Sequence, residues 1–179
     1  MLRLFVALDL PDGLKSDLLA ICGGVPGAKW RRHDQLHLTL RFIGEVDGAL
    51  ARDVRDALSG IDAPGFDLRV RGIGHFGDRK RPRVLWAGVE DNDELKRLQS
   101  KVARRLREVG LDDEHRKFHP HITLARLQGT PISEITAFES MFGGFSAPSF
   151  PVEDFILFSS YLSGEGAVYT PEAVYPLNG

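Results

Sequence analysis

Apolar residues recur along the chain at two spacings, and each spacing predicts one kind of element. Alternating or short unbroken apolar runs are typical of strands, and recurrence at three and four positions is typical of helices. Strands are expected at residues 4–10, 36–43, 66–73, 83–89, 121–127, 154–162 and 167–175. Helices are expected at residues 11–21, 46–58, 95–109 and 132–142. A basic loop at 74–82 and a turn at 163–166 join strand pairs, so the pattern predicts one α+β unit without a linker.

One of these strands occurs twice, together with the segment that follows it. His37-Leu-Thr-Leu-Arg-Phe-Ile-Gly runs from a strand into a turn and a helix, and His121-Ile-Thr-Leu-Ala-Arg-Leu-Gln-Gly does the same 84 residues later. A duplicated unit predicts two pseudo-equivalent lobes. The chain has six histidines and five threonines, so chance gives only about 0.2 His-x-Thr matches. Two matches in equivalent positions therefore favour a repeated functional motif over the alternative of two half-buried strands whose polar residues merely face water.

The repeated motif gathers its polar groups on one side of each strand. Side chains alternate between the two faces of a strand, so His37 and Thr39 share one face and the leucines beside them share the other. His121 and Thr123 repeat this arrangement. If the two lobes face each other, two imidazoles and two hydroxyls line one groove. Imidazole, with an ordinary pKa near ~6.5, serves as acid or base at neutral pH, so the pair predicts acid–base catalysis.

Composition and charge narrow the class of protein without naming a function. A hydrophobic fraction of 42% and a charged fraction of 27% are ordinary for a globular domain. The net charge of −2 gives no overall positive field. Any contact with nucleic acid must therefore come from local basic clusters.

The cysteine count and the apolar runs bear on location. Cys22 is alone, which excludes an internal disulfide framework and favours a reducing compartment. The first apolar run is broken at Asp9 and Pro11, too soon for a signal peptide. No apolar stretch approaches the ~20 residues of a membrane helix. We expect a cytoplasmic protein without membrane contact, and a monomer, because no exposed apolar stripe stands out.

Several longer segments carry a family resemblance. They are residues 3–11 and 36–45, the Val-Leu-Trp-Ala-Gly run at 84–88, the Phe-His-Pro-His-Ile-Thr-Leu-Ala-Arg run at 118–126, and the closing Phe158-Ser-Ser-Tyr-Leu162 with Gly166 and Tyr169. With its doubled His-x-Thr-x motif, the chain resembles the two-histidine phosphoesterase superfamily. More closely, it is similar to the bacterial and archaeal RNA 2′,3′-cyclic phosphodiesterases, also called the 2′-5′ RNA ligase family, over nearly its whole length.

The resemblance implies a fold and a chemistry. The fold is α+β, with two pseudo-symmetric lobes of antiparallel strands, helices on the outside and the motifs facing across a central cleft, in one domain over residues 1–179. The activity is hydrolysis of RNA 2′,3′-cyclic phosphate ends, or of small cyclic nucleotides, to 2′-phosphomonoesters without metal or cofactor. The reverse 2′-5′ ligation would use the same groups.

The resemblance also assigns roles to the motif residues. His37 is implied as proton donor and His121 as proton acceptor, while Thr39 and Thr123 orient the phosphate. From the residues alone, either histidine can be the acid, because a pseudo-symmetric site looks alike from both sides. Threonine hydroxyls suit the non-bridging oxygens and place phosphorus between the imidazoles for in-line attack.

Two arginines are further candidates for the phosphate site. Arg126 matches the arginine that often closes the family's second motif. Strand alternation counts against it, because position 126 falls on the face opposite His121 and Thr123. By the same alternation Arg41 shares the face of His37, although its counterpart in the second motif is an alanine.

Basic runs and aromatic side chains are weaker candidates for contact with RNA. Residues 79–83 and 29–32 are basic enough to touch the RNA backbone, although charge runs are usually solvated loops. Phe118, Trp30 and Tyr169 can stack on a base, although single aromatics are more often part of a core.

Two alternatives of other classes stay open. His119 and His121, with His115 or an aspartate, can share a zinc ion, which would make the protein a metal-dependent phosphoesterase. Pro120 between the two histidines disturbs the strand that this arrangement needs. The other alternative is a non-catalytic RNA-binding module with the same fold. Two intact His-Thr pairs argue against it, and turnover of a cyclic phosphate with EDTA present separates all three.

Overall fold

The computed structural model describes residues 1–178 and contains both helices and strands. The strands are β1 (Leu2–Asp9), β2 (Ala28–Trp30), β3 (His37–Val46), β4 (Phe66–Leu68), β5 (Val70–Gly77), β6 (Pro82–Val89), β7 (His121–Leu127), β8 (Phe150–Val152), β9 (Asp154–Ser163) and β10 (Gly166–Pro176). The helices are α1 (Asp12–Ile21), α2 (Gly48–Ser59), α3 (Asp93–Glu108) and α4 (Ile132–Phe142), with a 3₁₀ turn η1 (His33–Gln35).

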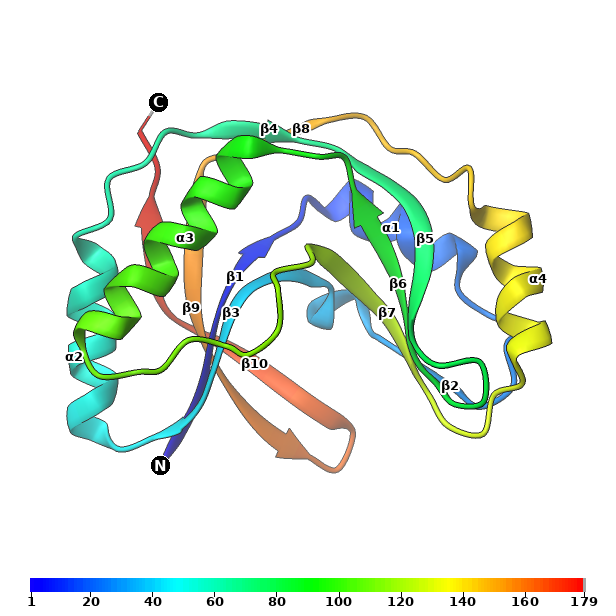
Figure 1. Ribbon diagram of the computed structural model, residues 1–179, viewed down its shortest axis with the longest axis horizontal. Helices are drawn as coiled ribbons and strands as arrows, with labels where there is room; N and C mark the ends of the chain where they lie inside the picture. The colour runs from blue at the N-terminus through cyan, green and yellow to red at the C-terminus, as the bar shows by residue number, and fades with distance from the viewer. Residues whose placement is uncertain (179) are drawn as a thin grey trace.

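The strands form one large antiparallel sheet in the order β10-β9-β1-β3-β7-β6-β5, with β2 pairing to β7 beside β3. β4 and β8 make a separate two-stranded ribbon. In Figure 1, α2 and α3 lie together at one side of the sheet and α4 lies at the opposite end, while the β9–β10 hairpin extends away from the helices. The two halves of the chain thus join edge to edge through β3 and β7.

One face of the sheet holds the main core. Apolar side chains from α1, α2 and α3 pack there against alternate residues of the central strands, including Leu38 and Ile122, neither of which is exposed. α4 extends this face over Leu85 and Ala125. The opposite face carries a smaller apolar cluster around Phe5. Because the helices cover only one face, polar side chains of the central strands are left available on the other.

Each motif strand contains a β-bulge at the same place. The pairing of β3 with β1 passes from Thr39 directly to Arg41, and the pairing of β7 with β6 passes from Thr123 directly to Ala125. The skipped residue is a leucine in both strands, and both it and the residue after it are buried. A bulge places two residues opposite one, so the alternation of side chains changes face beyond it. The internal repeat therefore extends to backbone geometry.

The expected α+β architecture is confirmed, and most elements lie close to their expected bounds. Two differences are informative. The strand expected at 66–73 is divided into β4 and β5, and the loop expected at 74–82 is mostly the β5–β6 hairpin. Glycine is typical of loops, so the glycines of this segment favoured a loop in the prediction from sequence. Gly74 is nevertheless part of β5, because a side chain there would meet the ring of Trp86. The short β2 and β8 carry too few residues for a recognisable period.

No helix among residues 1–178 is both long and apolar enough to cross a membrane.

Trp86 lies flat over the β5–β6 hairpin, and glycine makes room for it. A Cβ placed on Gly74 would meet three atoms of the indole six-membered ring closer than carbon atoms approach. We therefore predict that Gly74→Ala destabilises the protein by about 1–3 kcal/mol through overpacking, measured by urea denaturation. Gly164→Ala, in the β9–β10 turn with open space around it, is the control and should change stability little. Equal midpoints for the two variants would contradict the close packing of Trp86.

Candidate active site

The two His-x-Thr motifs lie side by side at the centre of the sheet. β3 and β7 pair antiparallel, with Leu38 opposite Ile122. Continuing that register by one residue in each direction sets His37 opposite Thr123 and Thr39 opposite His121. These four side chains are partly buried on the face away from the helices. Opposed side chains in an antiparallel pair are only ~5 Å apart at Cβ, so the residues that the sequence singled out form one cluster.

The ring of His37 is held at both nitrogens. Its Nδ1 lies 2.7 Å from the carbonyl oxygen of Gln35, and its Nε2 lies 2.9 Å from Thr39 Oγ1. A carbonyl can only accept a hydrogen bond, so Nδ1 carries the proton and neutral His37 presents the Nε2 lone pair, to which the Thr39 hydroxyl donates. Phe5 and Tyr169 pack against the ring, with centroids 4.9 and 5.3 Å away.

His121 repeats this arrangement on the neighbouring strand. Its Nδ1 donates to the carbonyl oxygen of His119 at 2.7 Å, so its lone pair is also at Nε2, which, unlike that of His37, is engaged by no hydroxyl among residues 1–178. Phe76 meets its ring edge to face, with centroids 4.8 Å apart, and Trp86 lies 6.3 Å away. Each imidazole thus has the same tautomer, fixed by the carbonyl two residues before it, and each has aromatic rings beside it.

Burial disfavours the protonated, positively charged form of both histidines in the ligand-free protein. Burial is the main cause that lowers the pKa of His37 to about 4; the charges of Arg31 and His121 act in the same direction, while the bond to Gln35 and the charge of Asp9 oppose them. Burial also lowers the pKa of His121, where the bond to the His119 carbonyl opposes it and the charge of His119 acts with it. Both rings are therefore neutral near pH 7, and each offers a lone pair at Nε2 to the site.

Arg126 lies on the same face as the motif histidines, which corrects the expectation from simple alternation. Its register partners are Val84 of β6 and Lys29 of β2, whereas the adjacent Ala125 and Leu127 are buried against α4. The bulge at Leu124 changes the face of every residue beyond it. Arg126 is therefore available to a ligand bound at the motifs.

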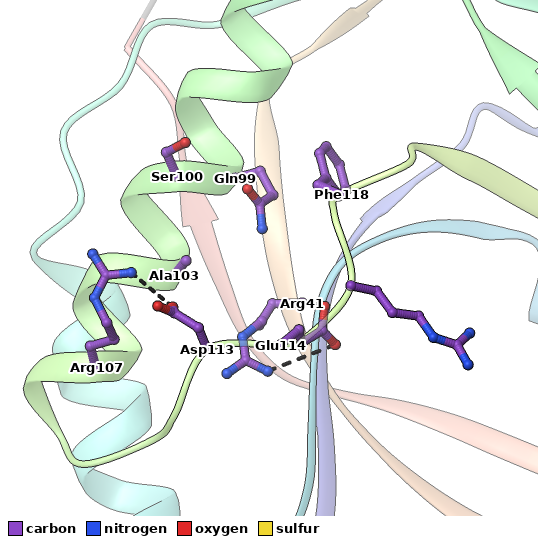
Figure 2. Close-up of a pocket in the computed structure, with 9 residues that line it drawn as sticks. Arg41, Gln99, Ser100, Ala103, Arg107, Asp113, Glu114 and Phe118 are labelled. Carbon is purple, nitrogen blue, oxygen red and sulfur yellow. Dashed lines mark hydrogen bonds and ion pairs between the residues drawn. The ribbon is translucent and has the colours of Figure 1, made fainter.

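The matching bulge at Leu40 of β3 has the opposite effect on Arg41, whose expected position on the His37 face is wrong. Arg41 is 6% exposed and lies opposite Val6 on the helix-covered side. Figure 2 shows it pointing toward Glu114 at the edge of a pocket of about 380 Å³ beside α3. Its guanidinium also donates to the carbonyl oxygens of Phe42 and Asp112. Arg41 thus ties the segment before β7 to β3.

The aromatic candidates divide between the two faces. Trp30 packs against Phe138 of α4, with ring centroids 5.8 Å apart, and Phe118 packs on the main core. Only Tyr169 lies at the site, where it meets His37 edge to face. Near His121, the second motif histidine, Trp86 and His119 line a pocket of about 630 Å³.

The metal alternative lacks a third ligand in residues 1–178, where no three His, Cys, Asp or Glu side chains gather. The rings of His119 and His121 are 6.4 Å apart at their centroids, and His121 Nδ1 is engaged by a carbonyl oxygen. Among the described residues, the two rings therefore lack the further ligands that a zinc site needs.

Gln35 is a site residue that sequence reasoning missed. Its carbonyl oxygen fixes His37, and its own side chain joins the backbone of Arg32 to Ala167 of the β9–β10 hairpin. Because the acceptor for His37 is a main-chain carbonyl, any residue type can supply it and the sequence carries no signal. Its side-chain contact spans 132 residues and depends on the fold alone.

Known proteins are similar to this chain over most of its length. The RNA 2′,3′-cyclic phosphodiesterase of Aeropyrum pernix is 36% identical over 148 residues, which is 82% of this chain and 84% of the relative. The protein of that name from Archaeoglobus fulgidus is 30% identical over 97% of this chain and 99% of the relative. The structure of E. coli LigT complexed with 3′-AMP superposes with a TM-score of 0.80, at 27% identity and 99% coverage of each chain.

A family model extends this similarity across both motifs. It is described as the 2′-5′ RNA ligase superfamily and matches residues 14–162, a span that contains β3, β7 and the strands that pair with them in the site, apart from β1. The relatives, the shared fold and the doubled motif agree, and the chain belongs to the 2′-5′ RNA ligase superfamily.

Proposed function

We propose that this protein hydrolyses 2′,3′-cyclic phosphate ends of RNA to 2′-phosphomonoesters by acid–base catalysis between His37 and His121. The observation that carries the proposal is the register of β3 with β7, which sets the two His-x-Thr motifs beside each other on one open face. Two relatives that match over most of this chain are RNA 2′,3′-cyclic phosphodiesterases. Incubation with 2′,3′-cyclic AMP and with a cyclic-phosphate RNA, resolving the 2′- and 3′-phosphate products, tests it.

The reaction needs one base and one acid on opposite sides of phosphorus. A water molecule attacks phosphorus as it gives its proton to Nε2 of His121. The bond from phosphorus to the ribose 3′ oxygen breaks, and that oxygen takes a proton from Nε2 of His37, leaving the phosphate on the 2′ oxygen. Both histidines present Nε2 to the site, because backbone carbonyls engage both Nδ1 atoms.

Two hydroxyls and one guanidinium suit the charge on the phosphate. Thr39 and Thr123 lie opposite His121 and His37 in the extended register, so each hydroxyl sits beside an imidazole and can hold one non-bridging oxygen. Arg126, on the same face, adds a positive charge whose attraction strengthens as the phosphate becomes more negative. Positioning of this kind lowers the barrier because the groups need no rearrangement during attack.

The bound phosphate supplies the negative charge that a protonated histidine needs and that the ligand-free site lacks. With a pKa of about 4, His37 is neutral at pH 7 and holds its one proton on Nδ1, so its Nε2 has no proton to donate until an anion arrives to stabilise the imidazolium. The role of donor for His37 and acceptor for His121 remains a prediction, because both pKa values are lowered. Substrate binding therefore has to select which of the two rings is protonated.

Three further properties remain predictions from the sequence. The single cysteine favours a reducing compartment, and so a cytoplasmic location. A monomeric state and a single domain over residues 1–179 complete the proposal, and Gly179 lies outside the described residues. Ligation of a cyclic phosphate to a 5′-hydroxyl would use the same two histidines in the same roles, with the 5′-hydroxyl in place of water.

Mutation of either catalytic histidine should remove nearly all activity. His37→Ala and His121→Ala should each lose at least ~100-fold in kcat/KM, and the double variant should be little worse, because the two act in one transition state. Thr39→Ala and Thr123→Ala should lose less. His33→Ala, an exposed histidine 3.7 Å from Asp12, is the control and should keep full activity. Near-normal turnover by His37→Ala would rule out the two-histidine mechanism.

The pH profile should reflect the lowered pKa values of both histidines. One ring must be neutral and the other protonated, so kcat/KM should be bell-shaped with limbs that belong to the pair. Because the pKa of His37 is about 4 and that of His121 is also below its ordinary value, the maximum of kcat/KM should lie on the acid side of neutrality. The limbs of kcat should lie at higher pH, since bound phosphate stabilises the protonated ring. A kcat/KM that is still rising at alkaline pH contradicts this.

Chelation should leave the activity intact, because two imidazoles supply both proton transfers. The measurement is turnover of 2′,3′-cyclic AMP before and after exhaustive treatment with EDTA, with a zinc-dependent phosphoesterase treated in parallel as the control. Loss of activity that zinc or manganese restores would favour the His119 and His121 metal site instead.

A further inference from the structure

A row of positive side chains leads away from the motifs along β2 and β7. Lys29 pairs with Arg126 across these strands, and the amide of Arg31 donates to the carbonyl oxygen of Leu124 at 2.8 Å. Side chains alternate along a strand, and Trp30 packs against α4, so Lys29 and Arg31 point to the opposite face. Lys29, Arg31 and Arg126 thus share the face of the catalytic histidines, and we call them the basic stripe.

One end of the basic stripe reaches the catalytic centre. After Arg31 the chain makes the short turn η1 and then enters β3, which also pairs with β7. Arg31 therefore lies beside Leu124 of β7, and His37 lies opposite Thr123 of the same strand. The charge of Arg31 contributes to the lowered pKa of His37, after the larger effect of burial. Arg31 therefore lies between the motif histidine and the rest of the basic stripe.

The basic stripe has no acidic partner among residues 1–178. None of its three members takes part in an ion pair or a side-chain hydrogen bond there. The neighbouring Arg32, by contrast, donates to the carbonyl oxygens of Glu165 and Ala167. Burial lowers the pKa of Arg31, Tyr169 raises it, and the nearby Arg126 lowers it, so the net effect of the surroundings disfavours the charged guanidinium. Since the whole chain carries a net charge of −2, this local excess of cations is a specific feature.

The three cations of the basic stripe lie close together and have no counter-ion among the described residues. Such a group suits an anionic ligand that carries more than one phosphate. In the proposed mechanism the reacting phosphate already has a hydroxyl for each non-bridging oxygen. A mononucleotide offers no second phosphate, whereas an RNA end offers one at every further nucleotide. Positions 29 and 31 are ~6.6 Å apart along the strand, comparable to the distance between successive phosphates of an extended strand. The spacing therefore matches a single-stranded backbone.

We propose that Arg31 and Lys29 of the basic stripe bind the phosphodiesters upstream of the cyclic end, with Arg31 on the first of them, while Arg126 serves the reacting phosphate. The protein then selects RNA ends over cyclic mononucleotides. This inference rests on the proposed function and adds the substrate's second phosphate to it. The Arg31 side chain makes no hydrogen bond within residues 1–178, and its backbone bond to Leu124 survives substitution.

The test compares three substrates that differ in that phosphate. They are 2′,3′-cyclic AMP, a diadenosine carrying one phosphodiester and a 2′,3′-cyclic end, and the same diadenosine with an uncharged methylphosphonate linkage. Because the charge of Arg31 also acts on His37, the readout is a ratio: Arg31→Gln should lower kcat/KM on the charged diadenosine at least ~10-fold more than on either of the other two substrates. The salt dependence of kcat/KM on the charged diadenosine should weaken by about 0.7 in logarithmic slope.

A matched control and the contrary outcomes complete the experiment. Arg104→Gln removes the same charge from an exposed position on α3 and should alter none of the three activities. An equal loss by Arg31→Gln on all three substrates would place Arg31 at the reacting phosphate and overturn the inference. So would a wild-type enzyme that turns over the methylphosphonate as well as the charged diadenosine. Failure of the wild-type protein on every cyclic phosphate would instead reject the proposed function.

Discussion

The pairing of β3 with β7 is the constraint on which the site depends. These strands come from different halves of the chain and meet through Leu38 and Ile122, both fully buried on the helix-covered face. Burial of that pair fixes the register, because a slip of one residue would turn every side chain to the wrong face. The antiparallel direction then sets each histidine beside the other strand's threonine. Core packing on one face of the sheet thus aligns catalytic groups on the other.

The paired bulges decide which arginines the site receives. In both motif strands a leucine is skipped in the pairing, and the following residue is buried with it. In β3 this turns Arg41 to the helix side, where it holds the segment that leads into β7. In β7 it turns Arg126 to the catalytic face. The same kind of bulge, present in both strands, turns one arginine to the helix-covered face and the other to the face of the motif histidines.

Desolvation dominates the electrostatics of the site. Aromatic rings beside His37 and His121 remove water, and both imidazoles are easier to keep neutral as a result. Main-chain carbonyls select the tautomer, so the lone pair at each Nε2 points to the site. Arg31 adds positive charge close to His37. Such a site favours an anionic ligand, whose negative charge would stabilise a protonated histidine.

The sequence by itself determined the elements, the internal repeat and the four motif residues. Those follow from local rules, because period and alternation are properties of neighbouring positions. It also indicated the buried and exposed sides of each motif as far as the leucine at the bulge. Beyond that leucine, alternation predicted the wrong face for Arg41 and for Arg126. A bulge depends on how two strands align, and no single strand records that.

Only the tertiary structure decided what surrounds the motifs. Gln35 holds His37 through a backbone carbonyl, and Tyr169 reaches the same ring from a hairpin more than 130 residues away in sequence. Arg31 belongs to the site because a short turn returns the chain to β7 beside it. These contacts are long-range, and the backbone groups involved are common to all residues. Local sequence therefore named the catalytic pair, and the fold set the positions, charges and tautomers on which its chemistry depends.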